Sequence, residues 1–594
     1  MESRPDHGQE RLFKEFPPIT DNQWEEKLLA ELKGKPLSKL DWNSPEGFML
    51  KAYYRAADIG AVSAADDKDV LPSRRGDAIK AGNPSWQIVQ AISLQSLPSA
   101  TSFLQKAQEA EVKAFLLEGE GQLVPQLLPS IDLGRSALHL SVSKLPVQFW
   151  RNLQIAAIEQ ETNPEWITGT CFLPPFTGAP LLDPISSLQL LPELYNATEP
   201  FPYFRSIGVD VRHVLDQGGT CSQQVGIALA TALEYIMHMS QQGIQTEKIL
   251  PNIAFLFSTA GSFFLEVAKL RSFRMLYSRL LELLGVEKPT EYTPFILATN
   301  TSWNKSSLDR HNNLLRATTE ATSAVLGGAH AVMVRPFDGK ETELGYRLAR
   351  NIQQLLAHEA YLGKVIDPGG GSYYLEKMTE AVAEKSWAFF QQIEEKGGLL
   401  QAHQVGFIQQ ALEAAKQQQL EKLLTTRQSL IGVNRYANPL EKVGGLTLDH
   451  MQERAASLFE KMRKETYQLA EPRGRPFTAG LLLVGDPKMR AARATFCENV
   501  MGVIGWETEK LVWEEGNPLP DTPDIFILCS SDADYPIHVP VIIHALKEKG
   551  NRVPILIAGK TDQFTEWGAS DCLYRGKNLQ EFHQSLHNQI SQPT

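Results

Sequence analysis

Eight short apolar runs, each followed by a helical or connecting segment, are the feature that most restricts the fold of this chain. Each run is four to seven residues long, and runs of this kind are typical of strands that are buried on both faces. Strands that alternate with helices predict parallel βα units, and eight of them predict a (β/α)8 barrel. The runs cover residues 86–92, 114–117, 137–142, 166–172, 206–211, 253–257, 295–299 and 331–334.

The last of these units shows the pattern most clearly. After the run at 331–334, apolar residues recur at helical spacing from Leu344 to Ala360, which places them on one face of a helix. The glycine-rich run at 367–371 then ends the regular structure before a second helical pattern starts at Ser372. A phosphate cradle requires a strand before the glycines. Because this run follows a helix and a short coil, a turn is the favoured interpretation.

Length and composition restrict the class of protein. A chain of 594 residues suits one domain of about 350 residues and another of about 120. The net charge of -11 argues against nucleic acid or an anionic membrane as the main partner. No apolar run approaches the roughly 20 residues that span a bilayer, and the amino terminus lacks the features of a signal or transit peptide. We therefore expect a cytoplasmic protein without membrane contact.

The five cysteines are scattered along the chain and lack CxxC spacing. They predict buried thiols in a reducing compartment, not disulfides or a zinc site. No metal site is predicted from the sequence.

Four segments are predicted. Residues 1–80 form an arm with a helix at 22–32 that Asp21 could cap. Residues 81–400 form the barrel, 401–475 form a helical linker, and 476–594 form a smaller domain. The linker is expected to hold helices at 402–426 and 448–469 and to end in the Pro- and Gly-containing stretch 471–476. The smaller domain alternates helical segments with aliphatic runs at 481–484, 525–528 and 554–558, a pattern typical of a doubly wound α/β fold.

The arm carries more apolar surface than it can bury by itself. Two interpretations stay open, namely that these residues pack against the barrel or that the arm embraces a partner subunit. The residues are Phe13, Phe16, Trp24, Leu28 and Leu29.

Three stretches carry a resemblance to a known family: ATSAVLGGAHAVMVRPFDG, RLARNIQQLL and VIDPGGGSYYLEKMTE. They resemble the closing part of the barrel of methylmalonyl-CoA mutase, an adenosylcobalamin-dependent radical isomerase. The similarity of arrangement extends over nearly the whole chain. It implies a TIM barrel that holds acyl-CoA along its axis, followed by a flavodoxin-like domain of the cobalamin-binding type. In the family, amino-terminal arms also embrace partner subunits.

The cobalamin loop of the family has the pattern DxHxxG, in which the histidine binds cobalt, the aspartate orients the imidazole and the glycine leaves room for the nucleotide tail. Asp486, Lys488 and Ala491 occupy these positions here. An ammonium group has no lone pair to offer to a metal. The loop is therefore predicted to be degenerate and to bind no cofactor. A leftover anion site in this loop is disfavoured because it lacks a GK[ST] signature.

Neighbouring positions of the smaller domain also differ from the cobalamin-binding pattern of the family. The serine pair of the family is matched by Ser530 and Ser531, but Asp532 and Asp534 follow it and add charge to the groove. A double glycine that lines the nucleotide in relatives is reduced to the pair at 558–559.

The catalytic positions of the barrel also differ from the family. His213 is present, but Arg212 replaces the tyrosine beside it. In the family this histidine donates a hydrogen bond to the thioester carbonyl. The polar runs that close the fourth and eighth strands are replaced at 172–174 and 333–335, and the CoA-gripping cluster is reduced to residues 71–77. Without these neighbours, His213 is predicted to be a structural residue and only a vestigial catalytic candidate.

The resemblance therefore implies the small, non-catalytic subunit of a heterodimeric methylmalonyl-CoA mutase. Its large-subunit partner would carry adenosylcobalamin and interconvert succinyl-CoA and methylmalonyl-CoA, while this chain would bind no cofactor. A pseudosymmetric dimer permits such loss of one site. Two alternatives stay open: a divergent isomerase that binds cobalamin without histidine, and an acyl-CoA-binding adaptor or an adaptor for the GTPase chaperone that loads mutases.

Overall fold

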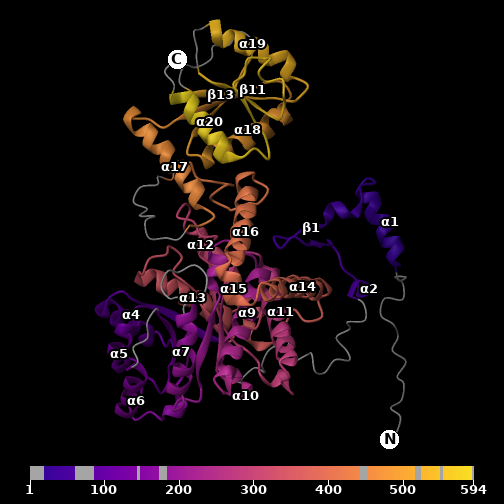
Figure 1. The fold of residues 1–594 in the computed structure, drawn as a ribbon. Coiled ribbons are helices and arrows are strands. Elements are labelled where there is room, and N and C mark those ends of the chain that lie inside the picture. Colours follow the sequence, from indigo (N-terminus) through magenta and orange to yellow (C-terminus); the bar gives the residue numbers. More distant parts are fainter. Residues whose placement is uncertain are drawn as a thin grey trace.

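The computed structural model describes residues 19–59, 86–142, 148–172, 184–439, 441, 453–514, 523–548 and 553–591. These residues form a barrel, a smaller α/β unit at one end of it, and an arm that stands to one side (Figure 1). A segment of helices connects the barrel to the smaller unit.

Eight parallel strands close into the barrel, and β10 pairs with β3 to complete the ring. This confirms the predicted fold class, and each predicted run contains a strand. The fourth strand starts later than expected because Trp166 belongs to a short 3-10 turn. The strands are β3 (Gln87–Leu94), β4 (Ala114–Gly119), β5 (Ala137–Val142), β6 (Thr168–Phe172), β7 (Phe204–Asp210), β8 (Ile253–Thr259), β9 (Phe295–Asn300) and β10 (Ala331–Met333).

Helices cover the outside of the barrel, and α14 (Tyr373–Glu395) packs across two of them, α9 and α11. Their inward faces join the outward faces of the strands in one large apolar cluster. The covering helices are α4 (Leu97–Glu109), α6 (Phe149–Glu159), α7 (Pro184–Ala197), α9 (Cys221–Gln241), α11 (Phe263–Leu283), α12 (Asn312–Leu326) and α13 (Glu343–His358).

The glycine-rich run forms a turn, as predicted, and this turn holds two helices together. The Asp367 carboxylate accepts a hydrogen bond from the buried Arg271 of α11 at 3.2 Å, and Arg271 also pairs with Glu376 of α14 at 2.7 Å. The Gly371 amide donates to Glu376 at 3.0 Å. Ser372 then caps α14 by accepting from the Leu375 amide. The run therefore links α11 to the start of α14.

The smaller unit is a parallel sheet with the strand order β12-β11-β13-β14-β15. Placing the first strand between the second and the third is the flavodoxin-like order, so the doubly wound prediction is confirmed. Two strands, β12 and β15, were not predicted. The strands are β11 (Thr478–Leu483), β12 (Glu507–Val512), β13 (Ile525–Cys529), β14 (Ile555–Ala558) and β15 (Asp571–Leu573), and the helices are α18 (Pro487–Val503), α19 (Tyr535–Glu548) and α20 (Leu579–Ser591).

The connecting segment contains α15 (Leu399–Gln404), α16 (Phe407–Leu424) and α17 (Ser457–Ala470). The first predicted helix is divided because Gly406 adopts a left-handed conformation, with φ of 76°. Helix α17 begins at Ser457, later than expected, and residues 442–452 lie outside the described part. One apolar cluster runs from Trp303 of the barrel through Phe459 of α17 to Leu481 of the smaller sheet. The smaller unit and α17 therefore share a core.

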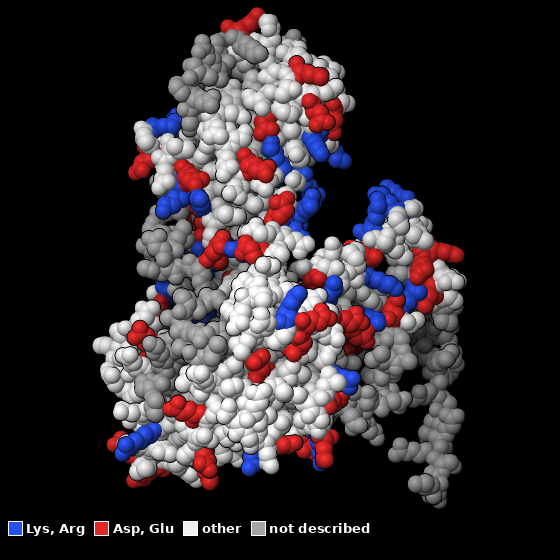
Figure 2. Space-filling model, viewed as in Figure 1, with Lys and Arg blue, Asp and Glu red and all other residues white. Residues whose placement is uncertain are grey.

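The arm contains α1 (Asp21–Glu31), β1 (Trp42–Asn43), β2 (Met49–Leu50) and α2 (Ala56–Ile59). Thr20, not Asp21, caps α1, because its hydroxyl pairs with the Gln23 amide in a capping box. Helix α1 buries no residue, and charged side chains of both signs lie along the arm (Figure 2). Phe13 and Phe16 lie outside the described residues. In this chain, α1 does not pack against the barrel.

The hairpin of the arm anchors it to the barrel. The Glu46 carboxylate accepts from the amides of Cys221 and Ser222 at 2.8 and 3.0 Å, where the dipole of α9 favours a negative charge. Leu50 is buried against α9, α11 and α14. The arm is therefore fixed at residues 44–54, while α1 stands away from the body.

All five cysteines are buried, as predicted. In the described part of the chain, no helix has the length and apolar character needed to cross a membrane.

Candidate functional site

Apolar side chains occupy most of the barrel axis, alongside the buried His139, which bonds to Thr170 at 2.8 Å. The apolar side chains project inward from seven of the eight strands, and each is at most 9% exposed. Large groups such as Phe172, Phe295 and Met333 lie among smaller alanines, as expected of a packed barrel core. An acyl chain along this axis would have to displace them. The cluster consists of Val89, Ala91, Ala114, Leu116, Ala137, Phe172, Ala254, Leu256, Phe295, Leu297, Ala331 and Met333.

Paired charged side chains lie at the carboxyl-terminal mouth of the barrel, where TIM-barrel enzymes place their active sites. Arg212 begins the short helix α8 (Arg212–Asp216) that follows β7. Its guanidinium donates to Asp210 at 2.6 Å and to Ser141 at 2.7 Å, and it pairs with Glu118 at the end of β4. Arg335, just after β10, donates to the same Glu118 carboxylate at 3.1 and 3.2 Å. Four strands are thus tied together across the mouth.

The charges of this mouth cluster compensate one another. Burial would raise the pKa of Glu118, but the charges and hydrogen bonds of Arg335 and Arg212 lower it to about 2. Burial would likewise lower the pKa of Arg212, whereas Asp210 and Glu118 raise it. Glu118 and Arg212 are therefore both ionised at neutral pH. A cluster that is already paired and hydrogen-bonded offers no free charge to a substrate.

A second group of buried polar residues holds the backbone of Arg212 in place. The Ser258 hydroxyl donates to the Arg212 carbonyl oxygen at 2.9 Å, and Gln224 donates to that hydroxyl at 2.9 Å. Lys269 donates to Gln224 at 2.8 Å and to the Ser258 carbonyl oxygen at 2.5 Å, and it pairs with Glu266. Both Lys269 and Glu266 are completely buried. Buried hydrogen bonds therefore hold the backbone of Arg212 in position.

His213 lies on the same short helix as Arg212. Burial lowers its pKa to about 4, with Asp210 and Asp216 opposing the change and Arg212 adding to it. The imidazole is consequently neutral at physiological pH. The two replacements noted in the sequence, Arg212 and Arg335, both bind Glu118. His213 follows Arg212 on α8.

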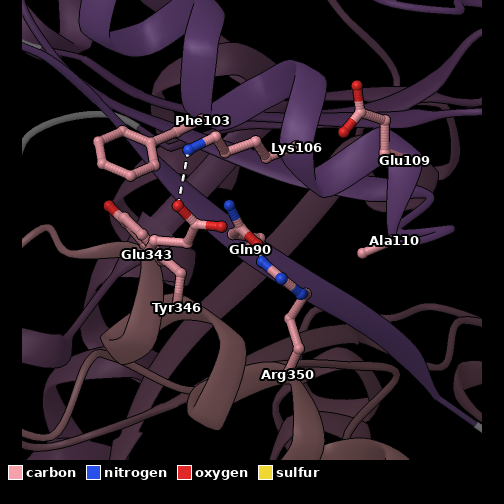
Figure 3. Close-up of a pocket in the computed structure, with 8 residues that line it drawn as sticks. All are labelled: Gln90, Phe103, Lys106, Glu109, Ala110, Glu343, Tyr346 and Arg350. Carbon is pink, nitrogen blue, oxygen red and sulfur yellow. Dashed lines mark hydrogen bonds and ion pairs between the residues drawn. The ribbon is translucent and has the colours of Figure 1, made fainter.

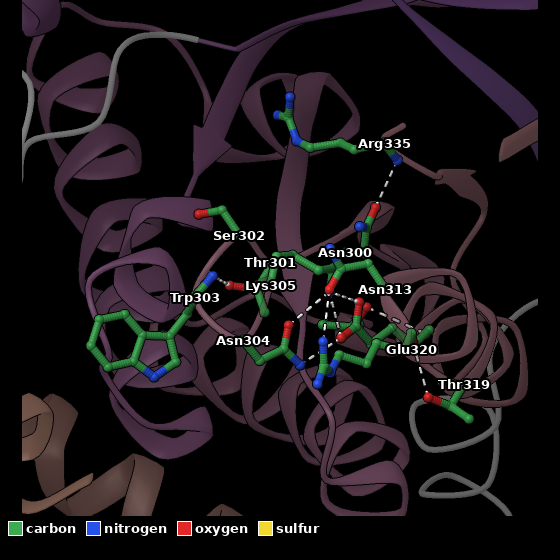
Figure 4. A network of polar contacts seen from close by, with 12 residues as sticks. Asn300, Thr301, Ser302, Trp303, Asn304, Lys305, Asn313, Thr319, Glu320 and Arg335 are labelled. Carbon is green, nitrogen blue, oxygen red and sulfur yellow. Dashed lines mark hydrogen bonds and ion pairs between the residues drawn. The ribbon is translucent and has the colours of Figure 1, made fainter. Parts of the chain in front are cut away.

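The loop after β9 carries a further set of polar contacts, which includes Asn300, Lys305 and Glu320 (Figure 4). Asn300 accepts from the Arg335 amide at 2.8 Å, and Lys305 forms a buried pair with Glu320 of α12 at 2.7 Å. The Lys305 carbonyl oxygen accepts from Arg454 at 2.9 Å, and Arg454 pairs with Glu460 of α17 at 2.7 Å. The barrel mouth and the connecting helices are thus joined through buried polar contacts.

The degenerate loop of the smaller unit is used to start a helix. Asp486 caps α18, accepting from the Met489 amide at 2.7 Å. Lys488 and Ala491 are exposed on the first turns of the helix. An aspartate that caps its own helix in this way is not placed to orient an imidazole two residues along the chain.

Side chains of the smaller unit fill the groove beside this loop. Asp534 accepts from the Asp486 amide at 3.1 Å and from the Ser530 hydroxyl at 3.4 Å. A Cβ atom added at Gly485 would lie 2.4 Å from the Asp534 carboxylate. The gap between the first and third strand ends is therefore closed by Asp534.

Arg493 fills the other half of the groove. It pairs with Asp532 at 2.7 Å, donates to the Ala558 carbonyl oxygen at 2.6 Å and lies over the Tyr535 ring. The Tyr535 hydroxyl donates to the same carbonyl oxygen at 2.5 Å. A Cβ atom added at Gly559 would lie 2.6 Å from Arg493. These residues do not fit a cobalamin whose nucleotide tail enters the groove and whose cobalt is held by an imidazole.

Sequence reasoning found Lys488, Arg212 and Arg335 but missed Glu118 and Asp210, which pair with the arginines. A carboxylate at the end of each of two buried strands was the available signal. A buried carboxylate needs a positively charged partner, and Arg212 is the partner of both Glu118 and Asp210.

The sequence comparisons identify the family of this chain. A family model described as methylmalonyl-CoA mutase matches residues 125–471. The chain is 29% identical to a methylmalonyl-CoA mutase small subunit of Porphyromonas gingivalis, with 93% of each chain covered. It is 29% identical to a small subunit of Streptomyces virginiae over 61% of each chain. A large subunit of that organism is 25% identical, over 74% of this chain and 65% of its own length. With more than half of its length matched by the family model, this chain belongs to the methylmalonyl-CoA mutase family.

Proposed function

We propose that this chain is the small, non-catalytic subunit of a heterodimeric methylmalonyl-CoA mutase. It would support a large subunit that binds adenosylcobalamin and interconverts succinyl-CoA and methylmalonyl-CoA. The observation that carries the proposal is the pairing of Arg212 and Arg335 with Glu118 across a filled barrel.

The barrel supports the absence of a substrate site. Acyl-CoA would need the axis, which is occupied by the apolar cluster around Phe172 and Met333. It would also need polar groups at the mouth that are free to bind it, whereas Glu118 and Asp210 hold the guanidinium of Arg212. Opening this cluster would leave buried charges without partners, which is costly.

The smaller unit supports the absence of cobalamin. Lys488 cannot donate a lone pair to cobalt while protonated, and the groove is filled by Arg493 and Asp534. We infer that the cofactor of the assembly is held by the partner alone.

The arm supports a role in assembly. Helix α1 has no buried residue in this chain. Trp24 and Leu29 on the helix, and Ile19 just before it, are exposed. Apolar side chains displayed on a projecting helix are typical of a surface that a partner covers. Streptomyces virginiae has both a small-subunit relative and a large-subunit relative of this chain. We infer that the arm of this chain contacts a large subunit.

The proposal is tested by producing this chain alone and together with a homologous large subunit. The chain alone should elute without corrin absorbance after incubation with adenosylcobalamin and should not convert succinyl-CoA. The co-produced pair should elute as a heterodimer with one cobalamin and mutase activity. A His213→Ala change in this chain should leave kcat and KM of the pair unchanged within about twofold.

Other results would favour the alternatives. Corrin absorbance that stays with the isolated chain would support a divergent isomerase. Saturable binding of succinyl-CoA to the isolated chain, without cobalamin, would support an acyl-CoA-binding adaptor. A large decrease of kcat in the His213→Ala pair would contradict the non-catalytic assignment.

A further inference from the structure

A cavity of about 250 Å³ lies on the outside of the barrel, between α4 and α13 (Figure 3). Its floor is Gln90, whose side chain points outward from β3 and is 3% exposed. Phe103 and Lys106 come from α4, and Tyr346 and Arg350 come from α13. This cavity is separate from the filled axis, because inward-facing positions of β3 such as Val89 and Ala91 belong to the axial cluster.

The two cations of the cavity have different partners. The Lys106 ammonium pairs with Glu343 at 2.8 Å, and Figure 3 shows this contact at the edge of the cavity. The Arg350 guanidinium is directed instead at Gln90 and donates to its amide oxygen at 2.6 Å. In the described part of the chain this is the one hydrogen bond that the Arg350 side chain makes, although a guanidinium has five N–H donors.

Arg350 is therefore a partly buried cation whose hydrogen-bond partner is neutral. Burial lowers the pKa of Arg350, and the neighbouring Arg347 lowers it further, with Glu343 opposing the change. The buried Arg271 and Arg454 differ in this respect, because each pairs with a carboxylate, at 3.1 and 2.7 Å. Among the described residues, Arg350 forms no ion pair within 4 Å, and a bound anion would supply one.

The geometry points to a binding site for a small, singly charged oxyanion, which the free edge of the Arg350 guanidinium would hold. The planar guanidinium matches the two oxygens of a carboxylate, and it also suits a phosphate. The acidic groups Glu109 and Glu343 in the wall oppose a second negative charge. Phe103 and Tyr346, whose rings lie 4.9 Å apart, offer an apolar surface to a short hydrocarbon tail. This site is independent of the proposed function.

The test titrates the full-length chain with sodium butyrate and, separately, with inorganic phosphate, at constant ionic strength maintained with chloride. Isothermal titration calorimetry should show saturable binding to one site. Tighter binding of butyrate would identify a carboxylate site, and tighter binding of phosphate would identify a phosphate site. Absence of saturable binding with both probes would overturn the inference.

Variants distinguish specific binding at Arg350 from a general attraction of anions to positive charge. Arg350→Gln should weaken binding at least about tenfold, since it removes a charge-assisted contact. Arg350→Lys keeps the charge but loses the planar fork and should also weaken binding. The exposed Arg347, three residues away on α13, provides the matched control, and Arg347→Gln should bind as the wild type does. Equal binding by Arg350→Gln and the wild type, or equal loss in Arg350→Gln and Arg347→Gln, would overturn the assignment. Circular dichroism establishes that each variant is folded.

Discussion

Arg212 and Arg335 donate hydrogen bonds to one carboxylate, that of Glu118. Each arginine stands at a position where the family sequence differs, and the two are far apart along the chain. Their meeting at Glu118 joins the carboxyl-terminal ends of β4, β7 and β10 through one set of paired charges.

Removing the shared carboxylate should destabilise the fold. Glu118→Gln leaves Arg212 and Arg335 with one negative charge fewer between them, and we expect the free energy of unfolding to fall by about 3 kcal/mol. Urea denaturation followed by circular dichroism measures this. Glu282→Gln, which removes the acid of an exposed pair with Arg279, should cost less than about 1 kcal/mol. Similar losses for both variants would contradict a structural role for Glu118.

Acid should weaken the packing of α20 on α17. His583 and His587 lie with ring centroids 3.8 Å apart, and both rings lie within hydrogen-bond distance of Thr466. Burial and the neighbouring His587 lower the pKa of His583 from 6.5 to about 4. The unfolded state therefore binds the proton more tightly. The resulting stability is complete above pH 6.5 and is lost as the pH falls through 4.

Unfolding free energies measured between pH 7.5 and 4.5 test this expectation. His139 and His213 have lowered pKa values as well, so the wild type should lose stability across the range. His583→Phe should reduce the slope in the lower part of that range by up to about 1.4 kcal/mol per pH unit, which corresponds to one proton. An unchanged slope would show that His583 keeps its ordinary protonation in the fold.

Restoring the imidazole should not restore cobalamin binding. Lys488→His supplies a cobalt ligand, but Asp486 still caps α18 and Arg493 and Asp534 still fill the groove. We expect no corrin absorbance to co-elute with this variant in gel filtration, as for the wild type. Co-elution with Lys488→His alone would mean that the missing ligand was the sole obstacle.

The buried pair of Arg454 and Glu460 should couple the barrel to the smaller unit. Both side chains are at most 1% exposed, and Glu460 also accepts from the Ser307 amide at 2.8 Å. Glu460→Ala leaves Arg454 uncompensated and should cost about 3–5 kcal/mol. Scanning calorimetry should then resolve two transitions, with the smaller unit melting first. A single transition at an unchanged temperature would contradict this coupling.

The two parts of the arm should respond differently to truncation. Trp24 is 36% exposed and Leu50 is 2% exposed. Trp24→Ala should lower the stability of the isolated chain by less than about 1 kcal/mol, while weakening its association with a large subunit. Leu50→Ala should cost about 3 kcal/mol in the isolated chain because it leaves a cavity. Analytical ultracentrifugation and urea denaturation distinguish the two effects, and unchanged association in Trp24→Ala would contradict the assigned role of α1.

The barrel was predictable because buried parallel strands are nearly continuous apolar runs, and all eight appear as such in the sequence. Strand β12 was not, since it lies at the sheet edge and its residues Glu507 to Val512 are mostly polar or exposed. Strand β15 has three residues, too few to show a period. The helix predicted at 402–426 is divided at Gly406, whose left-handed conformation depends on the packing of its neighbours.

The candidate site was predictable only in part. The replacements at Lys488, Arg212 and Arg335 could be recognised from the family pattern. Their consequences could not, because Glu118 reaches Arg212 and Arg335 through closure of the barrel, which sequence spacing does not encode. For the same reason, the cavity at Arg350 was not foreseen, since β3 and α13 meet only where the ring of strands closes.

The core that joins Trp303, Phe459 and Leu481 sets a limit on how this protein could be rearranged in evolution. A descendant that lost its carboxyl-terminal unit after the stretch at 471–476 would expose apolar side chains of α17 to water. Another protein surface would then have to cover them. The barrel end of the molecule therefore depends on this unit for its packing, whether or not the unit binds a ligand.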